Sequence, residues 1–233
     1  NDRKYFAKLF LDTDLEWIGW ALSDSVTLSY NTGLKFLSFN CTDGLGMLQS
    51  ILLQIAPETN INQYKIILDY IRTSLNALLF PTNPNIYISC NYYASGMLTR
   101  DDSVSDDVFT QAYLPSRTFL GEIYTYLDSL SVLSNILKSF GCRIFMARGR
   151  WNIVSVNEIA KDNFYYTLYD YQGNVLSGGI DNSLSIIQGY VGNTSNVYFI
   201  NGNQTKIMRK GYNKINSLHS YTPCKNYISN GNL

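Results

Sequence analysis

The chain has 233 residues, of which 45% are hydrophobic and only 15% charged, with 19 Tyr and 11 Phe. This length suits one large domain or two small ones with proper cores, and the composition excludes a disordered chain. Eighteen basic residues balance eighteen acidic ones, which disfavours a surface built mainly to bind nucleic acid or an anionic membrane.

Four apolar runs rich in strand-forming residues occupy residues 4–40. They read KYFAKLFL, EWIGWALS, SVTLSY and LKFLSFN, and short stretches with Asp, Ser, Asn or Gly separate them. Runs of this kind between turn residues predict strands, here an antiparallel meander.

Two helices are predicted next. Thr42 or Asp43 can cap the first, which Pro57 ends, and its apolar positions share one face: Leu45, Leu48, Leu52, Ile55. The second is predicted over residues 60–80, because apolar residues keep helical spacing there until PTNPN stops it.

A strand and an acidic segment follow. IYISCNYYA predicts the strand, and RDDSVSDDVF contains four carboxylates: Asp101, Asp102, Asp106, Asp107. Their spacing fits no EF-hand, so we expect a solvated loop rather than a calcium site.

The clearest local signal is a helix and hairpin at residues 128–156. Asp128 or Ser129 can cap the helix, Lys138 suits its last turn, and Gly141 suits its end. The apolar positions of this helix form one face: Leu130, Leu133, Ile136, Leu137, Phe140. CRIFMA and RWNIVSV then predict two strands joined by an Arg148-Gly149 turn, and we expect the helix to pack on this hairpin with Trp151 buried.

The remaining chain is predicted to be β-rich. FYYTLYDYQGNVLSGG indicates a hairpin with its turn at Gly173-Asn174, and residues 177–206 indicate strands with long loops. KIMRKGYNKINSLHSY indicates a final strand region.

Catalytic motifs are sparse. His219 is the single histidine, and it lies beside Ser217, Ser220 and Cys224 in a polar stretch that favours a surface histidine over a catalytic one. The sequence contains no G-x-S-x-G, phosphate-loop or dinucleotide-binding motif. We therefore expect no enzyme, and we assign no catalytic, cofactor-binding or metal-ligating residue.

Some weaker patterns stay open. Glu16 beside Trp17, or Glu122 among Tyr124 and Tyr126, would suit a sugar cleft, although strand positions explain both glutamates equally well. The cysteines form no close pair, which favours free thiols over disulfides or metal: Cys41, Cys90, Cys142, Cys224. Three glycosylation patterns in an Asn-rich chain are given no function: Asn40, Asn193, Asn203.

No signal-peptide pattern and no apolar run near ~18 residues occurs, so we expect no membrane span. The chain begins at Asn1 without an initiator Met, and we expect it to be a piece of a longer protein.

Two motifs are similar to those of phage tail-hub proteins, namely the hub of contractile baseplates and the related protein at the tip of long-tailed phages, notably in prophages of gut bacteria. The first is D-G-L at residues 43–45 with a following Leu48. The second combines an L-x-x-I-L-x-x-F-G helix with a G-x-W turn: Leu133, Ile136, Leu137, Phe140, Gly141, Gly149, Trp151. The order of elements resembles the family over roughly residues 1–225, while residues 81–115 and 177–206 match no part of it.

This resemblance implies an α+β fold of antiparallel, barrel-like β domains with two or three amphipathic helices. It implies a first domain at residues 1–115, a second at 116–225, and the start of an appended module or linker at 226–233. The implied role is structural: in the virion, a homotrimer assembled in the bacterial cytoplasm connects the tail tube and distal tail proteins to tip or receptor-binding proteins. DNA would only pass through its lumen.

Two alternatives belong to other classes of protein. A carbohydrate-binding β module would use exposed aromatic residues as platforms, with Trp17, Trp20 and Trp151 as the best candidates. A tail-borne glycan hydrolase is the third hypothesis.

The final segment NYISNGNL resembles the N-x-I-x-N-G-x-F start of jelly-roll modules appended to tail proteins. Asn226, Ile228, Asn230 and Gly231 match, and Leu233 stands in for phenylalanine. A strand that starts there needs more chain to pair with, so we expect the gene to continue into β-sandwich domains, although a frayed polar tail is the alternative.

Overall fold

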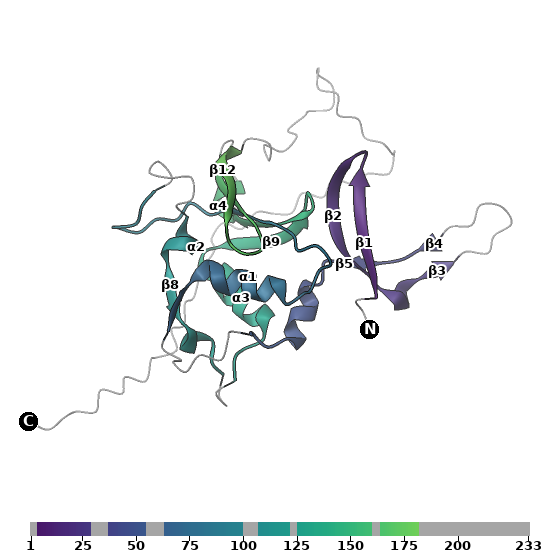
Figure 1. Cartoon of the computed structure of the whole chain (residues 1–233), viewed down its shortest axis with the longest axis horizontal. Helices are drawn as coiled ribbons and strands as arrows, with labels where there is room; N and C mark the ends of the chain where they lie inside the picture. Colours follow the sequence, from purple (N-terminus) through teal and green to yellow (C-terminus); the bar gives the residue numbers. More distant parts are fainter. Residues whose placement is uncertain are drawn as a thin grey trace, which may run out of the picture. The chain divides into compact units, whose positions relative to one another are not determined.

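The computed structural model describes residues 4–28, 37–54, 63–99, 107–121, 125–159 and 164–181, all within the compact unit Asn1–Ile186 (Figure 1). Helices and strands both build this unit, so the predicted α+β class is confirmed. The sheets formed by these residues are open, and none of them closes into a barrel. The predictions for residues 182–233 lie outside the described residues.

The strands are β1 (Tyr5–Leu11), β2 (Asp14–Ala21), β3 (Thr27–Leu28), β4 (Leu37–Ser38), β5 (Cys41–Thr42), β6 (Tyr64–Ile66), β7 (Ile86–Ser89), β8 (Tyr113–Pro115), β9 (Cys142–Ala147), β10 (Arg150–Ser155), β11 (Phe164–Tyr169) and β12 (Val175–Asp181). The α-helices are α1 (Ile67–Asn76), α2 (Val108–Gln111), α3 (Ser129–Ser139) and α4 (Val156–Ile159). The 3-10 helices are η1 (Ser23–Ser25), η2 (Leu45–Ser50) and η3 (Ser116–Phe119).

All four N-terminal runs form strands, as predicted, but they do not form one meander. β1 and β2 make an antiparallel hairpin, and β5 rather than β3 pairs with the other side of β2. The backbone N–H of Leu22 also donates to the carbonyl of Asn40 at 2.9 Å, which holds β5 in that place. β3 and β4 therefore form a separate two-stranded sheet.

The first predicted helix is present as the shorter η2. Gly44 precedes it with a φ of 86°, and the Asp43 carboxylate accepts a hydrogen bond from the Leu45 N–H at 3.0 Å. The chain becomes extended at Ile51, where the backbone of residues 51–53 bonds to residues 127–129 instead of continuing the helix. Pairing with a distant segment thus ends the helix before Pro57.

The second predicted helix is also shorter than expected. Residues 64–66 form β6, which pairs with β8, so α1 begins only at Ile67 and ends at Asn76. Its buried face agrees with the predicted spacing: Ile67, Leu68, Tyr70, Ile71, Ser74, Leu75.

A five-stranded sheet of order β12-β11-β7-β10-β9 forms the centre of the unit. β7 pairs antiparallel with β11 but parallel with β10, so the sheet is mixed rather than wholly antiparallel. α1 and α3 lie side by side, and their buried residues share one core with this sheet (Figure 1). The β11–β12 hairpin confirms the turn predicted near Gly173, which has a φ of 93°.

The predicted helix and hairpin at residues 128–156 are confirmed. Asp128 caps α3 by accepting from the Ser131 N–H at 2.8 Å, and Gly141 follows the helix with a φ of 59°. Arg148 and Gly149 both have positive φ, as a tight turn between two paired strands requires. α3 packs on β9, and Trp151 is only 1% exposed.

An aromatic chain joins the β1–β2 hairpin to the main core. The ring centroids of Phe6 and Trp20 lie 5.4 Å apart, those of Trp20 and Phe80 lie 5.6 Å apart, and those of Phe80 and Trp151 lie 6.2 Å apart. Such ring contacts add stability beyond buried area. The N-terminal hairpin is therefore part of the same core as the central sheet.

We predicted a boundary between two domains at residue 115, and their separate folding stays a prediction. In the structure, however, β7 comes from before that residue and its two neighbours β10 and β11 come from after it. The main core likewise takes residues from both sides. The described parts of residues 1–115 and of residues 116–225 therefore share one sheet and one core.

Candidate functional site

The outer face of the β1–β2 hairpin is apolar over most of its length. The strand register places seven uncharged residues on this face, which we call the outer apolar face: Tyr5, Ala7, Leu9, Leu11, Trp17, Gly19, Ala21. Asp14 pairs with Leu11 and bounds this face with a charge at the turn of the hairpin. Tyr5, Leu9 and Leu11 are 52%, 60% and 68% exposed. Contiguous exposed apolar surface of this kind marks interaction sites in soluble proteins.

Gly19 allows this face to be flat. A Cβ atom built on Gly19 would lie 2.3 Å from the Trp17 ring and 2.2 Å from the carbonyl oxygen of Thr42. The indole of Trp17 therefore lies across the glycine. Its position leaves Trp17 half-buried and keeps the outer apolar face free of a protruding side chain at its centre.

A hollow continues the outer apolar face at one end. It has a volume of about 510 Å³, and Tyr5 and Ala21 contribute to both surfaces. The other residues that line the hollow are Leu22, Ser23, Val26, Leu37 and Phe39. Val26, Leu37 and Phe39 are 54%, 58% and 49% exposed, so the exposed apolar surface extends from β1 to β4.

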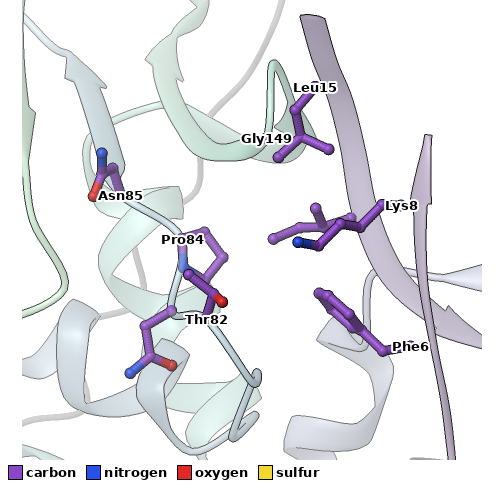
Figure 2. A pocket seen from close by; sticks show the side chains of 9 residues that line it. Phe6, Lys8, Leu15, Thr82, Pro84, Asn85 and Gly149 are labelled. Carbon is purple, nitrogen blue, oxygen red and sulfur yellow. The ribbon is translucent and has the colours of Figure 1, made fainter. Parts of the chain in front are cut away.

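A second cavity lies on the opposite, inner face of β1 and has a volume of about 210 Å³. Figure 2 shows it between β1 on one side and residues 82–85 on the other, with the turn at Gly149 above. We call it the β1 pocket. It is lined by Phe6, Lys8, Leu15, Ile18, Thr82, Asn83, Pro84, Asn85 and Gly149.

Gly149 joins the β9–β10 turn to β2 beside the β1 pocket. Its backbone N–H donates to the carbonyl of Glu16 at 3.3 Å, and a Cβ atom built on it would lie 2.7 Å from Leu15 Cδ2. With a φ of 64°, the residue needs both the conformation and the small size of glycine. The G-x-W turn therefore docks the β9–β10 hairpin against β2.

Replacing Gly149 by alanine should lower the free energy of unfolding by about 1 to 3 kcal/mol, because left-handed strain and overpacking act together. Chemical denaturation of the purified protein measures this. Gly141→Ala is the matched control, since Gly141 has a φ of 59° but nothing within 4 Å of the added Cβ atom. An equal loss in both variants would mean that the close approach to Leu15 contributes nothing.

The residues predicted for a sugar platform lie mostly in the core. Trp20 and Trp151 are 4% and 1% exposed, and only Trp17 is partly accessible. Glu16 is half-buried on β2 next to Trp17, whereas Glu122 and Tyr124 lie outside the described residues. The structure thus leaves a carbohydrate-binding module with one of its three predicted platforms.

We predicted that Asp107 lies in a solvated loop. This prediction is wrong for Asp107, because the residue is fully buried. Its carboxylate caps α2 by accepting from the Phe109 N–H at 2.7 Å, and it also accepts from the Tyr169 hydroxyl. These donors occupy the carboxylate and explain its burial. Asp101, Asp102 and Asp106 lie outside the described residues.

The three described cysteines are free thiols. Cys41 is exposed, Cys90 is buried and Cys142 is half-buried. A hydrogen bond with Cys90, together with burial, raises the pKa of the Cys142 thiol well above its usual range. Cys142 is therefore a poor nucleophile, because the thiolate is the reactive form.

The other predicted site residues fall outside the described ranges or stand alone. His219, Cys224, Asn193 and Asn203 lie beyond residue 181, and Asn40 is exposed. Within the described ranges, no three His, Cys, Asp or Glu side chains lie together as a metal site requires. No helix in these ranges is long and apolar enough to cross a membrane.

Comparisons of the chain with protein-family models, with curated proteins and with solved structures give no match.

The outer apolar face was missed from the sequence, although a signal for it is present. In KYFAKLFL both alternating sets of residues are apolar apart from the lysines. A strand with one face on the core and the other in water alternates between apolar and polar residues. Apolar residues on both faces of an edge strand therefore indicate a second surface to be covered.

Proposed function

We propose that the chain is a structural component of a phage tail tip or baseplate hub, where a trimeric ring of copies connects the tail tube to distal tip or receptor-binding parts. The observation that carries the proposal is the outer apolar face of the β1–β2 hairpin, with the adjoining hollow. Subunits of a ring need such apolar contact surfaces more than a polar cleft. The occupant of this face is a neighbouring copy of the chain.

The positions of the hub-like motif residues support a role in assembly. Leu133, Ile136 and Trp151 are buried in the core, and Gly149 docks the β9–β10 turn on β2. These residues fix the N-terminal hairpin relative to the central sheet, and chemistry is not required of them. In this proposal the helix and hairpin hold the contact surface in place, and the protein has no catalytic turnover.

The barrel-like form of hub domains belongs to the same proposal. Among the described residues β1 is an edge strand, and an exposed apolar edge is a ready template for pairing with another chain. Strands of a neighbouring copy can therefore extend the open N-terminal sheet. The neutral net charge suits a lumen through which DNA passes without binding.

The experiment that tests this proposal is imaging of intact particles by electron cryomicroscopy with the chain labelled by a fused epitope. We expect the chain on the central axis at the tail tip or baseplate, in three copies. A position away from the axis would contradict the proposal. Hydrolysis of cell wall or glycan that is lost on mutating a pair of acidic residues would also contradict it.

Replacing Leu9 and Leu11 together by lysine should reduce incorporation into particles about tenfold or more, because two charges would be buried in the contact. The free energy of unfolding should change by no more than about 1 kcal/mol, since both side chains are exposed. Quantitative immunoblotting of purified particles and denaturation of the free chain measure the two effects. Leu79→Lys is the matched control, because Leu79 is 70% exposed but lies outside the outer apolar face. Normal incorporation of the double variant would show that this face is not the assembly contact.

A further inference from the structure

The β1 pocket contains a cation without a counter-ion. Lys8 lies on the inner face of β1 beside Phe6, and its amino nitrogen is 5.7 Å from the centre of that ring. No lining residue is acidic, and no carboxylate in the described part of the chain forms an ion pair with Lys8. Lys8 is exposed, so water solvates its charge in the free protein and an anion that enters the pocket can reach it.

Uncharged polar side chains add hydrogen-bonding capacity to the same pocket. Thr82, Asn83 and Asn85 line it. Figure 2 shows the Lys8 amino group and the Thr82 hydroxyl directed into the space between β1 and residues 82–85. A hydroxyl and carboxamide groups offer donors to an anion without adding further positive charge.

The rest of the lining is apolar. Ile18 and Pro84 are buried, and Phe6 and Leu15 are packed against the main core. A pocket with apolar walls and a few convergent polar groups is the usual form of a small-molecule site. Its volume of about 210 Å³ exceeds the ~150 Å³ cavity that accepts a benzene ring.

We propose that the β1 pocket binds a carboxylate carried on a small apolar body. Lys8 neutralises the carboxylate, Thr82 and Asn83 donate hydrogen bonds to it, and Phe6 and Leu15 contact the apolar part. A single lysine suits a carboxylate better than a phosphate group, which is commonly held by several cations or an arginine fork. The carboxylate has two possible sources, a free organic acid or the C-terminus of a peptide chain.

The test is titration of the ¹⁵N-labelled protein, followed by NMR, with benzoate and with its neutral analogue benzamide. We expect saturable shifts of the Gly149 backbone amide and of the Asn83 side-chain amide with benzoate, and at least about fivefold weaker binding of benzamide. Lys8→Met should weaken benzoate binding by about fivefold or more, while Lys8→Arg should retain it. Lys4→Met is the matched control, because the Lys4 amino group lies over the Tyr5 ring and Lys4 does not line the pocket.

A peptide with a free C-terminal carboxylate and its amidated form distinguish the two sources. Preference for the free peptide over benzoate assigns the pocket to a chain terminus, and preference for benzoate assigns it to a free acid. Equal binding of benzoate and benzamide, or equal losses in Lys4→Met and Lys8→Met, would overturn the proposal. Absence of any saturable shift would overturn it as well. If the parent binds no carboxylate and the Lys8→Met variant self-associates, the role of Lys8 is instead to keep the edge strand β1 from pairing with another chain.

Discussion

Replacing Trp151 by alanine should lower the free energy of unfolding by about 3 to 5 kcal/mol, which is the range for large aromatic residues removed from a core. Trp151 is 1% exposed, pairs with Ile86 on β7 and Met146 on β9, and has its ring 6.2 Å from that of Phe80. Its removal leaves a cavity where the central sheet meets the N-terminal hairpin. Equilibrium denaturation in urea measures the loss.

Two further variants separate the causes of this loss. The indole nitrogen of Trp151 is buried without a hydrogen-bond partner, so Trp151→Phe should lose volume only and cost less than Trp151→Ala. Leu79→Ala should change the free energy by no more than about 0.5 kcal/mol, because that side chain is 70% exposed. A Trp151→Ala protein as stable as the parent would show that this residue does not join the two parts of the core.

Replacing Leu133 or Ile136 by alanine should cost about 2 to 5 kcal/mol, the range for buried aliphatic side chains. The two residues are 1% and 3% exposed and belong to the face of α3 that shares a core with the central sheet. The cost comes from lost burial and from the cavity that remains. Thermal and urea denaturation of both variants measure it.

Asn135→Ala is the matched control on the same helix, because Asn135 is exposed and its side chain contributes no hydrogen bond to the fold. It should change the free energy of unfolding by no more than about 0.5 kcal/mol. If Leu133→Ala and Ile136→Ala denature like the parent, the buried face of α3 has been assigned wrongly.

The parts of the fold that were predicted correctly are those in which a few neighbouring residues decide the structure. The Asp128 cap, the glycine at 141 and the turn at 148–149 lie within a short segment, and each acts on the backbone beside it. Local sequence therefore contains the information needed for α3 and its hairpin.

The predictions that failed depend on distant partners. Residues 64–66 have helical spacing in the sequence but pair with β8, some fifty residues later. β5 replaces β3 beside β2, and the parallel pairing of β7 with β10 joins segments far apart in the chain. Tertiary pairing overrides local preference in such segments, so periodicity alone could not predict them.

The β1 pocket could not be predicted for a similar reason. Lys8, Thr82 and Gly149 come from three segments with no shared motif, and only the docking of the β9–β10 turn on β2 brings them together. Lys4 and Lys8 belong to the same run KYFAKLFL, and only Lys8 lines the pocket.

β7 is synthesised before both of its neighbours in the central sheet, β10 and β11. Translation reaches Ile86, Tyr87 and Ile88 before either neighbouring strand has been synthesised. All three residues are fully buried in the folded protein. β10 follows about 60 residues later, which corresponds to roughly 3 to 12 seconds at a translation rate of ~5–20 residues per second. For that time an apolar segment of the nascent chain has no strand partner, which is the kind of segment that chaperones bind. Synthesis of the α3–β10 segment therefore supplies the first strand partner of β7.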